Sequence, residues 1–322
     1  MKKRILLGHL AAAGAYLIFG VNVVVCRDIA SADALPPIVL FALRAGGATV
    51  LFWLLAIARP RETVPPKDLL RIAGASLLGI FLPQITFLHG IALTTPVDLT
   101  IVNTTTPILT MFVAAIFLKE PITWKKVLGV VVSFGGILWL ILQSVLLGGG
   151  SNQTQPLGLV YCFANSTVFA LYLGICRPVI SRYSVVTTMK WMFLLSFLLS
   201  IPFVVPHLPE TQWTALCARQ WWEVAFVILF STFVAYFLIP YGQQRIRPTL
   251  VSMYGYLQPI VAISIAITTG MDRLTVTKVL AALLVFVGVY IVNQSRAATP
   301  MADNRKQSIV TNPSTDSSRK SQ

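Results

Sequence analysis

The feature that most constrains this chain is a succession of long apolar runs separated by short polar stretches. A helix needs about 20 apolar residues to cross a bilayer, because lipid leaves every backbone polar group to be satisfied within the helix. Segments that meet this requirement have the approximate limits 8–27, 36–58, 70–93, 97–118, 124–143, 156–176, 185–206, 222–244, 247–269 and 275–294. The sequence therefore predicts an all-α integral membrane protein with ten transmembrane helices in a lipid bilayer.

The composition fits a membrane protein better than a soluble one. Hydrophobic residues make up 56% of the chain and charged residues only 11%, whereas a soluble domain carries about 25% charged residues. A net charge of +14 would suggest nucleic acid, but the cations stand in short clusters between apolar runs, as they do in membrane proteins. We expect no nucleic-acid partner. The four cysteines lack metal-ligand spacing, so we also expect no metal and no cofactor.

The positions of the cations predict the orientation. Most of the 25 Lys and Arg residues fall on one side of the predicted bundle, and the opposite side holds only Arg27, Arg219, Arg273 and Lys278. Short loops rich in Lys and Arg stay in the cytoplasm. The sequence therefore predicts a multi-pass protein of a bacterial inner (plasma) membrane with both termini cytoplasmic. Residues 295–322 are rich in Ser, Thr, Asn and charge, and we predict that they form a disordered cytoplasmic tail.

An internal duplication is visible when the chain is compared with itself. At a shift of 152 residues, segment 97–140 aligns with segment 249–292 without a gap. Pro107 then falls on Pro259, and Lys126 falls on Lys278. Two unrelated apolar segments would share hydrophobic residues by chance, but not the same placement of Pro, Gly and Lys. The sequence therefore predicts two five-helix repeats, within residues 1–146 and 156–294.

The odd number of spans in each repeat means that the second copy enters the membrane upside down. Inverted repeats are typical of secondary transporters, in which the substrate site lies between the copies near mid-membrane. TIVNTTTPIL (100–109) and SMYGYLQPIV (252–261) are equivalent, and each places polar groups ahead of a proline. Proline frees a backbone carbonyl, which a bilayer tolerates only where that carbonyl faces protein or a wet cavity. We predict that both segments line a central cavity.

These features resemble those of a known family. The five-plus-five spans, the arginine in LFALRAGG (40–47) and the run NTTTPILTMFVAAIFLKEPITWKKVLGVVVSFGGIL (103–138) are similar to EamA-type exporters of the drug/metabolite transporter superfamily. The resemblance covers about residues 8–294. It implies ten helices around a central cavity and export of small metabolites, such as amino acids or amphipathic drug-like compounds. The second repeat departs from the pattern at Asp272-Arg273, where an acidic residue followed by Pro would be expected.

Polar side chains inside the spans are the candidates for binding a small-molecule metabolite. Each alone is more often a contact between helices, worth about 0.6 kcal/mol on average. As a set they fall on corresponding helices of both repeats, which favours a shared polar pocket. The candidates are Asn22, Arg44, Gln84, His89, Asn103, Thr106, Asn165, Tyr172, Tyr241 and Gln258.

Arg44 is the candidate with the strongest physical requirement for a partner. A cation inside a span costs about 2.5–3.5 kcal/mol on insertion scales, so it needs a partner or a wet cavity. It could be the counter-ion for an anionic group of the substrate. The alternative is an arginine that ties helices together or extends toward the membrane surface.

Acidic residues lie at the ends of the spans and not at their centres. Proton-driven transporters usually keep a carboxylate or histidine along the path, and only His89 and Asp98 could serve. His89 could instead be a neutral histidine hydrogen-bonded between helices. Glu120 and Asp272 end equivalent helices at opposite faces, where capping or pairing with a nearby cation is the simpler role and gating the alternative.

Three alternatives to a coupled exporter stay open or are disfavoured. A passive facilitator or uniporter of the same solutes remains open, because proton coupling is not assured. A channel would need an open polar pore, which inverted repeats argue against. A membrane transferase would need acidic pairs or His clusters for a metal or phosphate, and the sequence has none, so we expect no enzyme. A homodimer is compatible with the sequence.

Overall fold

The computed structural model describes residues 2–118, 124–146 and 154–294. Within these ranges the chain is all-helical, with eight helices long and apolar enough to cross a membrane and two shorter apolar ones, Val127–Gln143 and Val276–Ile291. The fold prediction of ten spans is confirmed. The predicted tail and Glu120 lie outside the described residues.

The first repeat contains five spans, three unbroken helices and two composite ones. Its elements are α1 (Lys2–Ser31), α2 (Pro37–Ile57), α3 (Pro66–Ser76), the π-helix η1 (Leu77–Phe81), α4 (Leu82–Leu93), α5 (Pro96–Asn103), α6 (Thr106–Leu118) and α7 (Trp124–Leu146). The third span is α3–η1–α4, and the fourth is α5–α6.

The second repeat has the same plan. Its elements are α8 (Pro156–Ile175), α9 (Arg177–Ile180), α10 (Val185–Val204), η2 (Val205–His207), η3 (Trp213–Ala215), α11 (Ala218–Phe226), the π-helix η4 (Val227–Val234), α12 (Ala235–Gln243), α13 (Pro248–Met253), η5 (Tyr254–Tyr256), α14 (Leu257–Thr268) and α15 (Val276–Gln294). Its third span is α11–η4–α12, and its fourth is α13–η5–α14. The two π-helices occupy equivalent places in the two repeats.

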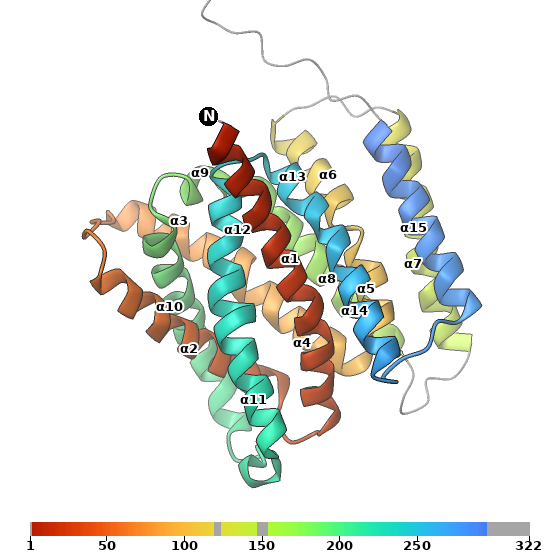
Figure 1. The fold of residues 1–322 in the computed structure, drawn as a ribbon, viewed down its shortest axis with the longest axis horizontal. Helices are drawn as coiled ribbons and strands as arrows, with labels where there is room; N and C mark the ends of the chain where they lie inside the picture. Colours follow the sequence, from red (N-terminus) through yellow and green to blue (C-terminus); the bar gives the residue numbers. More distant parts are fainter. Residues whose placement is uncertain (1, 119–123, 147–153, 295–322) are drawn as a thin grey trace, which may run out of the picture.

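The packing of the helices follows the duplication. α1 packs against α12 and α14, and its counterpart α8 packs in the same way against α4 and α6. Figure 1 shows the pair α7 and α15 at one edge of the bundle and α2 with α10 at the other. Where the repeats meet, equivalent positions contact each other: Gln84 Nε2 donates to the Tyr236 hydroxyl at 2.9 Å, and the Ser133 hydroxyl donates to the Val285 carbonyl at 3.2 Å. These pairs are both 152 residues apart, which indicates a pseudo-twofold relation between the repeats.

Small residues bring α7 and α15 into close contact. A Cβ built on Gly288 would lie 2.3 Å from the Gly129 carbonyl oxygen, and one on Gly136 would lie 2.8 Å from the Ala281 carbonyl oxygen. Neither glycine can therefore carry a side chain without separating the helices, as is usual for small-residue contacts between membrane helices.

The fourth span of each repeat is interrupted before its proline. The helix ends at Asn103 and resumes at Thr106, and the equivalent helix passes through η5 at Tyr254–Tyr256. The Thr104 and Thr105 hydroxyls donate to carbonyls of the preceding turn, at 2.6 and 2.7 Å. These threonines therefore satisfy the backbone of the break, and only part of the polar run in TIVNTTTPIL is left to face a cavity.

Candidate functional site

A small cavity lies between the two repeats, at the level of the interrupted helices. Its volume is about 70 Å³, which is room for only a few water molecules. α1, α2, α4, α5, α6, α8, α12, η5 and α14 contribute to its wall. The cavity is thus built from both repeats, as an inverted-repeat transporter requires.

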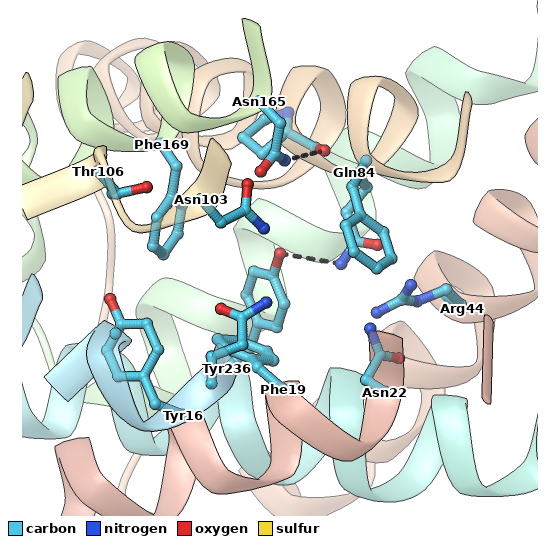
Figure 2. A pocket seen from close by; sticks show the side chains of 14 residues that line it. Tyr16, Phe19, Asn22, Arg44, Gln84, Asn103, Thr106, Asn165, Phe169 and Tyr236 are labelled. Atoms are coloured by element: carbon cyan, nitrogen blue, oxygen red, sulfur yellow. Dashed lines mark hydrogen bonds between the residues drawn. The ribbon is translucent and has the colours of Figure 1, made fainter. Parts of the chain in front are cut away.

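Most of the residues predicted to bind substrate line this cavity. Figure 2 shows polar side chains from opposite walls pointing toward one another, with aromatic rings between them. The predicted residues that line it are Asn22, Arg44, Gln84, Asn103, Thr106, Asn165 and Gln258. Thr106 and Gln258 are equivalent residues of the two repeats, and they reach the same cavity.

Arg44 is almost fully buried, with 2% of its surface exposed. Its Nε donates to the Thr232 hydroxyl at 3.0 Å, and Nη1 lies 3.8 Å from Cys26 Sγ. Thr232 belongs to η4, and the widened π-helical turn brings its hydroxyl to the guanidinium. None of the ion pairs among the described residues involves Arg44. A guanidinium has five N–H groups, and that of Arg44 has only the two contacts with Thr232 and Cys26. It therefore keeps N–H donors free for an anion.

Gln84 and Tyr236 cross the middle of the cavity. Gln84 donates to the Tyr236 hydroxyl through Nε2, but its Oε1 is buried and has no hydrogen-bond partner among the described residues. The Tyr16 hydroxyl is in the same situation. A buried polar atom without a partner is costly, so these atoms are suited to a ligand that supplies donors and acceptors.

Two asparagines brace the opposite wall. Asn165 Nδ2 donates to the Pro83 carbonyl at 2.7 Å, and Asn103 Oδ1 accepts from the Ser166 hydroxyl at 3.0 Å. One polar atom of each amide is therefore hydrogen-bonded to the protein, and the other atom of the amide faces the cavity.

The structure does not bring three of the predicted residues to the cavity. His89 stacks on Tyr161, with ring centroids 5.4 Å apart. Tyr172 is buried against Gly79, whose added Cβ would lie 2.4 Å from the tyrosine ring. Tyr241 lies toward the end of α12, with the Arg245 guanidinium 3.3 Å from its ring centroid. Sequence reasoning assigned them by residue type, and it could not see which face of each helix points inward.

Sequence reasoning missed the aromatic lining. The cavity is walled by Tyr16, Phe19, Phe87, Phe169 and Tyr236. Aromatic residues are common in apolar helices, so none carried a signal alone. The one available signal was the alignment of Phe19 with Phe169, at a shift of 150 residues in the first span of each repeat.

The two ends of the bundle differ in their charged groups. We call the end at which α1 begins the inner end and the opposite one the outer end, following the predicted orientation. At the outer end Asp98 and Asp272 share Lys278, and Arg219 pairs with Asp28. Asp272 thus lies in the connection between α14 and α15 and pairs with a nearby lysine.

At the inner end, loops of the two repeats are joined by hydrogen bonds. The Tyr183 hydroxyl donates to the Asp68 carboxylate at 2.5 Å, and this bond raises the pKa of Tyr183. Partial burial acts to raise the pKa of Glu62, but hydrogen bonds from Thr187 and Ser184 outweigh it and leave that pKa below its usual value. The inner loops therefore favour a carboxylate at Glu62 and a neutral phenol at Tyr183.

No group of three or more His, Cys, Asp or Glu side chains that could hold a metal occurs in the described ranges. The residues that line the cavity offer neutral hydrogen-bonding groups, aromatic faces and one cation. This set can bind and orient a small amphipathic molecule.

Ten membrane helices in two repeats around a shared central cavity are the architecture of a membrane transporter. The sequence pattern of the EamA-like transporter family matches this chain twice, over residues 6–142 and 156–294, and the chain belongs to that family.

Relatives with transporter names occur in several organisms. The chain is 25% identical to the uncharacterized transporter YetK of Bacillus subtilis, over 79% of this chain and 77% of that protein. It is 25% identical to an uncharacterized transporter of Archaeoglobus fulgidus, over 81% and 90%. A solved crystal structure shares the fold with a TM-score of 0.62 and 16% identity, covering 89% of this chain and 96% of that one.

Proposed function

We propose that this chain exports a small amphipathic metabolite, such as an amino acid or a drug-like compound, through the central cavity by alternating access. The observation that carries the proposal is Arg44, a buried cation with no carboxylate partner among the described residues, in a cavity with aromatic walls. A guanidinium in such a place favours a substrate with a carboxylate or another anionic group. The aromatic rings would hold the apolar part of the same molecule.

The size of the cavity supports movement of the repeats. A space of about 70 Å³ is too small for a metabolite, since ligand pockets usually have roughly 300–1,000 Å³. Substrate would enter only when the repeats separate at one end. Rocking of two inverted repeats provides that motion.

The test is counterflow of radiolabelled amino acids in proteoliposomes. Arg44→Ala is expected to reduce transport at least about 10-fold, since hydrogen bonds to a charged group contribute roughly 1.5–3 kcal/mol. Arg44→Lys should restore little, because lysine cannot reproduce the planar fork of donors. Arg59→Ala, in an exposed loop, is the matched control and should transport normally.

A facilitated mode remains the second candidate, because no carboxylate lines the cavity among the described residues. A pH gradient across the liposome separates the two modes. An effect of the gradient on net flux would support coupling, and its absence would support a facilitator. If no solute moves under either condition, while Arg44→Ala and the wild type behave alike, the proposed function is wrong.

A further inference from the structure

The outer end contains a second hollow of about 620 Å³. Its walls come from both repeats: α1, α5 and α7 on one side, and the α14–α15 connection and the start of α15 on the other. No residue lines both this hollow and the central cavity. Asp98 lines it from the first repeat, and Asp272 and Lys278 from the second.

One ammonium joins the two carboxylates across the repeats. Lys278 Nζ lies 2.8 and 3.0 Å from the two oxygens of Asp272, but 3.5 Å from Asp98 Oδ2. The side chains of Asp98, Asp272 and Lys278 are only 5, 7 and 13% exposed. The cluster is therefore withdrawn from water, and its cation is bound mainly to Asp272.

The charges of this cluster do not balance. Two ionised carboxylates and one ammonium would leave one negative charge in a buried place, which is unfavourable. Carboxylates that share a site commonly avoid this by retaining one proton. Because Lys278 already contacts both oxygens of Asp272, Asp98 is the group that lacks compensation.

The two oxygens of Asp98 have different surroundings. Oδ2 accepts from the hydroxyls of Thr95 and Thr154. Oδ1 is buried and has no hydrogen-bond partner in the described part of the chain. An ionised carboxylate would leave a charged acceptor unsatisfied. In a protonated carboxyl, Oδ1 is a neutral carbonyl oxygen, and the O–H on Oδ2 can donate to a threonine hydroxyl beside it.

Among the described residues, Lys278 is the only cation that pairs with Asp98. From α1, Arg27 is near enough to Asp272 to interact with its charge, but its guanidinium donates to backbone carbonyls of α4, and Asp28 pairs with Arg219. Arg273 in the α14–α15 connection is exposed, and Cys162 of α8 is a buried thiol. Among the described residues, α4 and α7 place no titratable side chain on the hollow.

We propose that Asp98 is a proton-binding site, protonated while the outer ends of the repeats are held together around Lys278. When these ends separate, the O–H bond of the carboxyl breaks, the proton passes to outer water, and the carboxylate keeps the electron pair. Outward opening is therefore favoured at high pH and opposed at low pH. The gating part rests on the proposed function, whereas the proton site does not.

Infrared difference spectroscopy of the full chain in lipid nanodiscs tests the site through the carbonyl-stretch band of a protonated carboxyl. At neutral pH, where a wet aspartate is ionised, the wild type should show this band. In the Asp98→Asn variant this band should be weaker by the intensity of one protonated carboxyl. Asp33→Asn is the matched control, because Asp33 is exposed on the same face and its positive φ of 50° suits asparagine; it should keep the full band.

A band unchanged by Asp98→Asn would overturn the proposal. If that variant does not fold, Thr154→Val tests the same assignment, because it keeps the Asp98 carboxyl but removes the Thr154 hydroxyl that is hydrogen-bonded to it. The band should then shift in frequency, and an unshifted band would assign the proton to another group.

Distances between spin labels test the gate. Labels at Ser31→Cys and Leu274→Cys, with Cys217 replaced by Ala, report the separation of the outer ends, since both positions are exposed and the other three cysteines are buried. A longer distance between the labels should become populated as pH rises. In the Asp98→Asn variant, whose neutral side chain imitates the protonated carboxyl, the distance should stay short at every pH. Opening at low pH would contradict the proposal. A chain that shows these responses but moves no solute would refute the proposed function and leave the proton site intact.

Discussion

The two ends of the bundle are built on equivalent helices but are closed by different chemistry. At the outer end, the first turn of α5 places Asp98 near Lys278, whereas Leu250 stands at the equivalent place in α13. At the inner end the His9 ring nitrogen lies 2.9 Å from the Tyr254 hydroxyl, and the ion pair of Asp68 and Arg182 has its arginine side chain 59% exposed. The two ends thus share a backbone arrangement but carry different charged groups, so their stability can respond differently to pH.

Glycines make the helix packing at the two ends alike, although their charged groups differ. At the outer end a Cβ on Gly158 would lie 2.6 Å from Thr94 Cγ2, and at the inner end one on Gly8 would lie 2.8 Å from Arg245 Cβ. These glycines align at the shift of 150 residues that relates the first spans of the two repeats. Close approach of the first span of one repeat to the third span of the other is therefore common to both ends, and the charges are what differ.

The largest expected effect comes from removing the outer cation. Lys278→Met should lower the free energy of unfolding by about 3–5 kcal/mol, because Asp272 would lose its partner in a buried place. Thermal unfolding in detergent measures the loss. A change below about 1 kcal/mol would show that the outer cluster behaves like an exposed surface pair.

A smaller effect is expected from filling the outer glycine. Gly158→Ala should destabilise the chain by about 1–3 kcal/mol, because the added methyl meets the Leu93 backbone and the Thr94 side chain. Gly74→Ala is the control, since nothing lies within 4 Å of its Cβ. Equal melting temperatures of the two variants would contradict the close contact.

The inner ion pair should matter less than the outer one. Arg182→Met should cost at most about 1 kcal/mol, because the Arg182 side chain is 59% exposed and Asp68 keeps Arg71 and Tyr183 as partners. The comparison with Lys278→Met in the same unfolding experiment is the measurement. A loss as large as that of Lys278→Met would remove the distinction between the ends.

The smallest effect concerns pH at the inner loops. The lowered pKa of Glu62 means that its carboxylate stabilises the fold above the ordinary value of 4.5, and that this stabilisation is lost as pH falls below it. Glu62→Gln should therefore be slightly less stable than the wild type at pH 7 and no less stable in acid. A difference that grows as pH falls would have the wrong sign.

Much of the architecture could be predicted from the sequence because lipid imposes strict rules. Span length, cation asymmetry and the duplication around Pro107 and Pro259 gave the ten helices and their two repeats. Polar residues such as Asn22 and Gln84 could be placed near the cavity because such residues fall on corresponding helices of both repeats, which favoured a shared pocket.

The rest depends on contacts that no local pattern encodes. The π-helices η1 and η4 have no compositional mark, yet η4 brings Thr232 to Arg44. Tyr172 and Tyr236 look alike in sequence, but only the second faces the cavity. The contact between Asp98 and Lys278 joins residues in different repeats, and only the packing of α5 and α15 brings them together.

Disulfide locks at the two ends test alternating access most directly. Gly90→Cys with the native Cys162 would lock the outer end, and Ala12→Cys with Gly242→Cys would lock the equivalent inner one, in a background lacking the other native cysteines. A Cβ on Gly90 would lie 2.9 Å from Cys162 Sγ, and one on Gly242 would lie 3.7 Å from Ala12 Cβ, separations that suit a disulfide. If the repeats rock around the central cavity, each lock alone stops solute counterflow and a reductant restores it. Undiminished counterflow through fully cross-linked protein would contradict that motion.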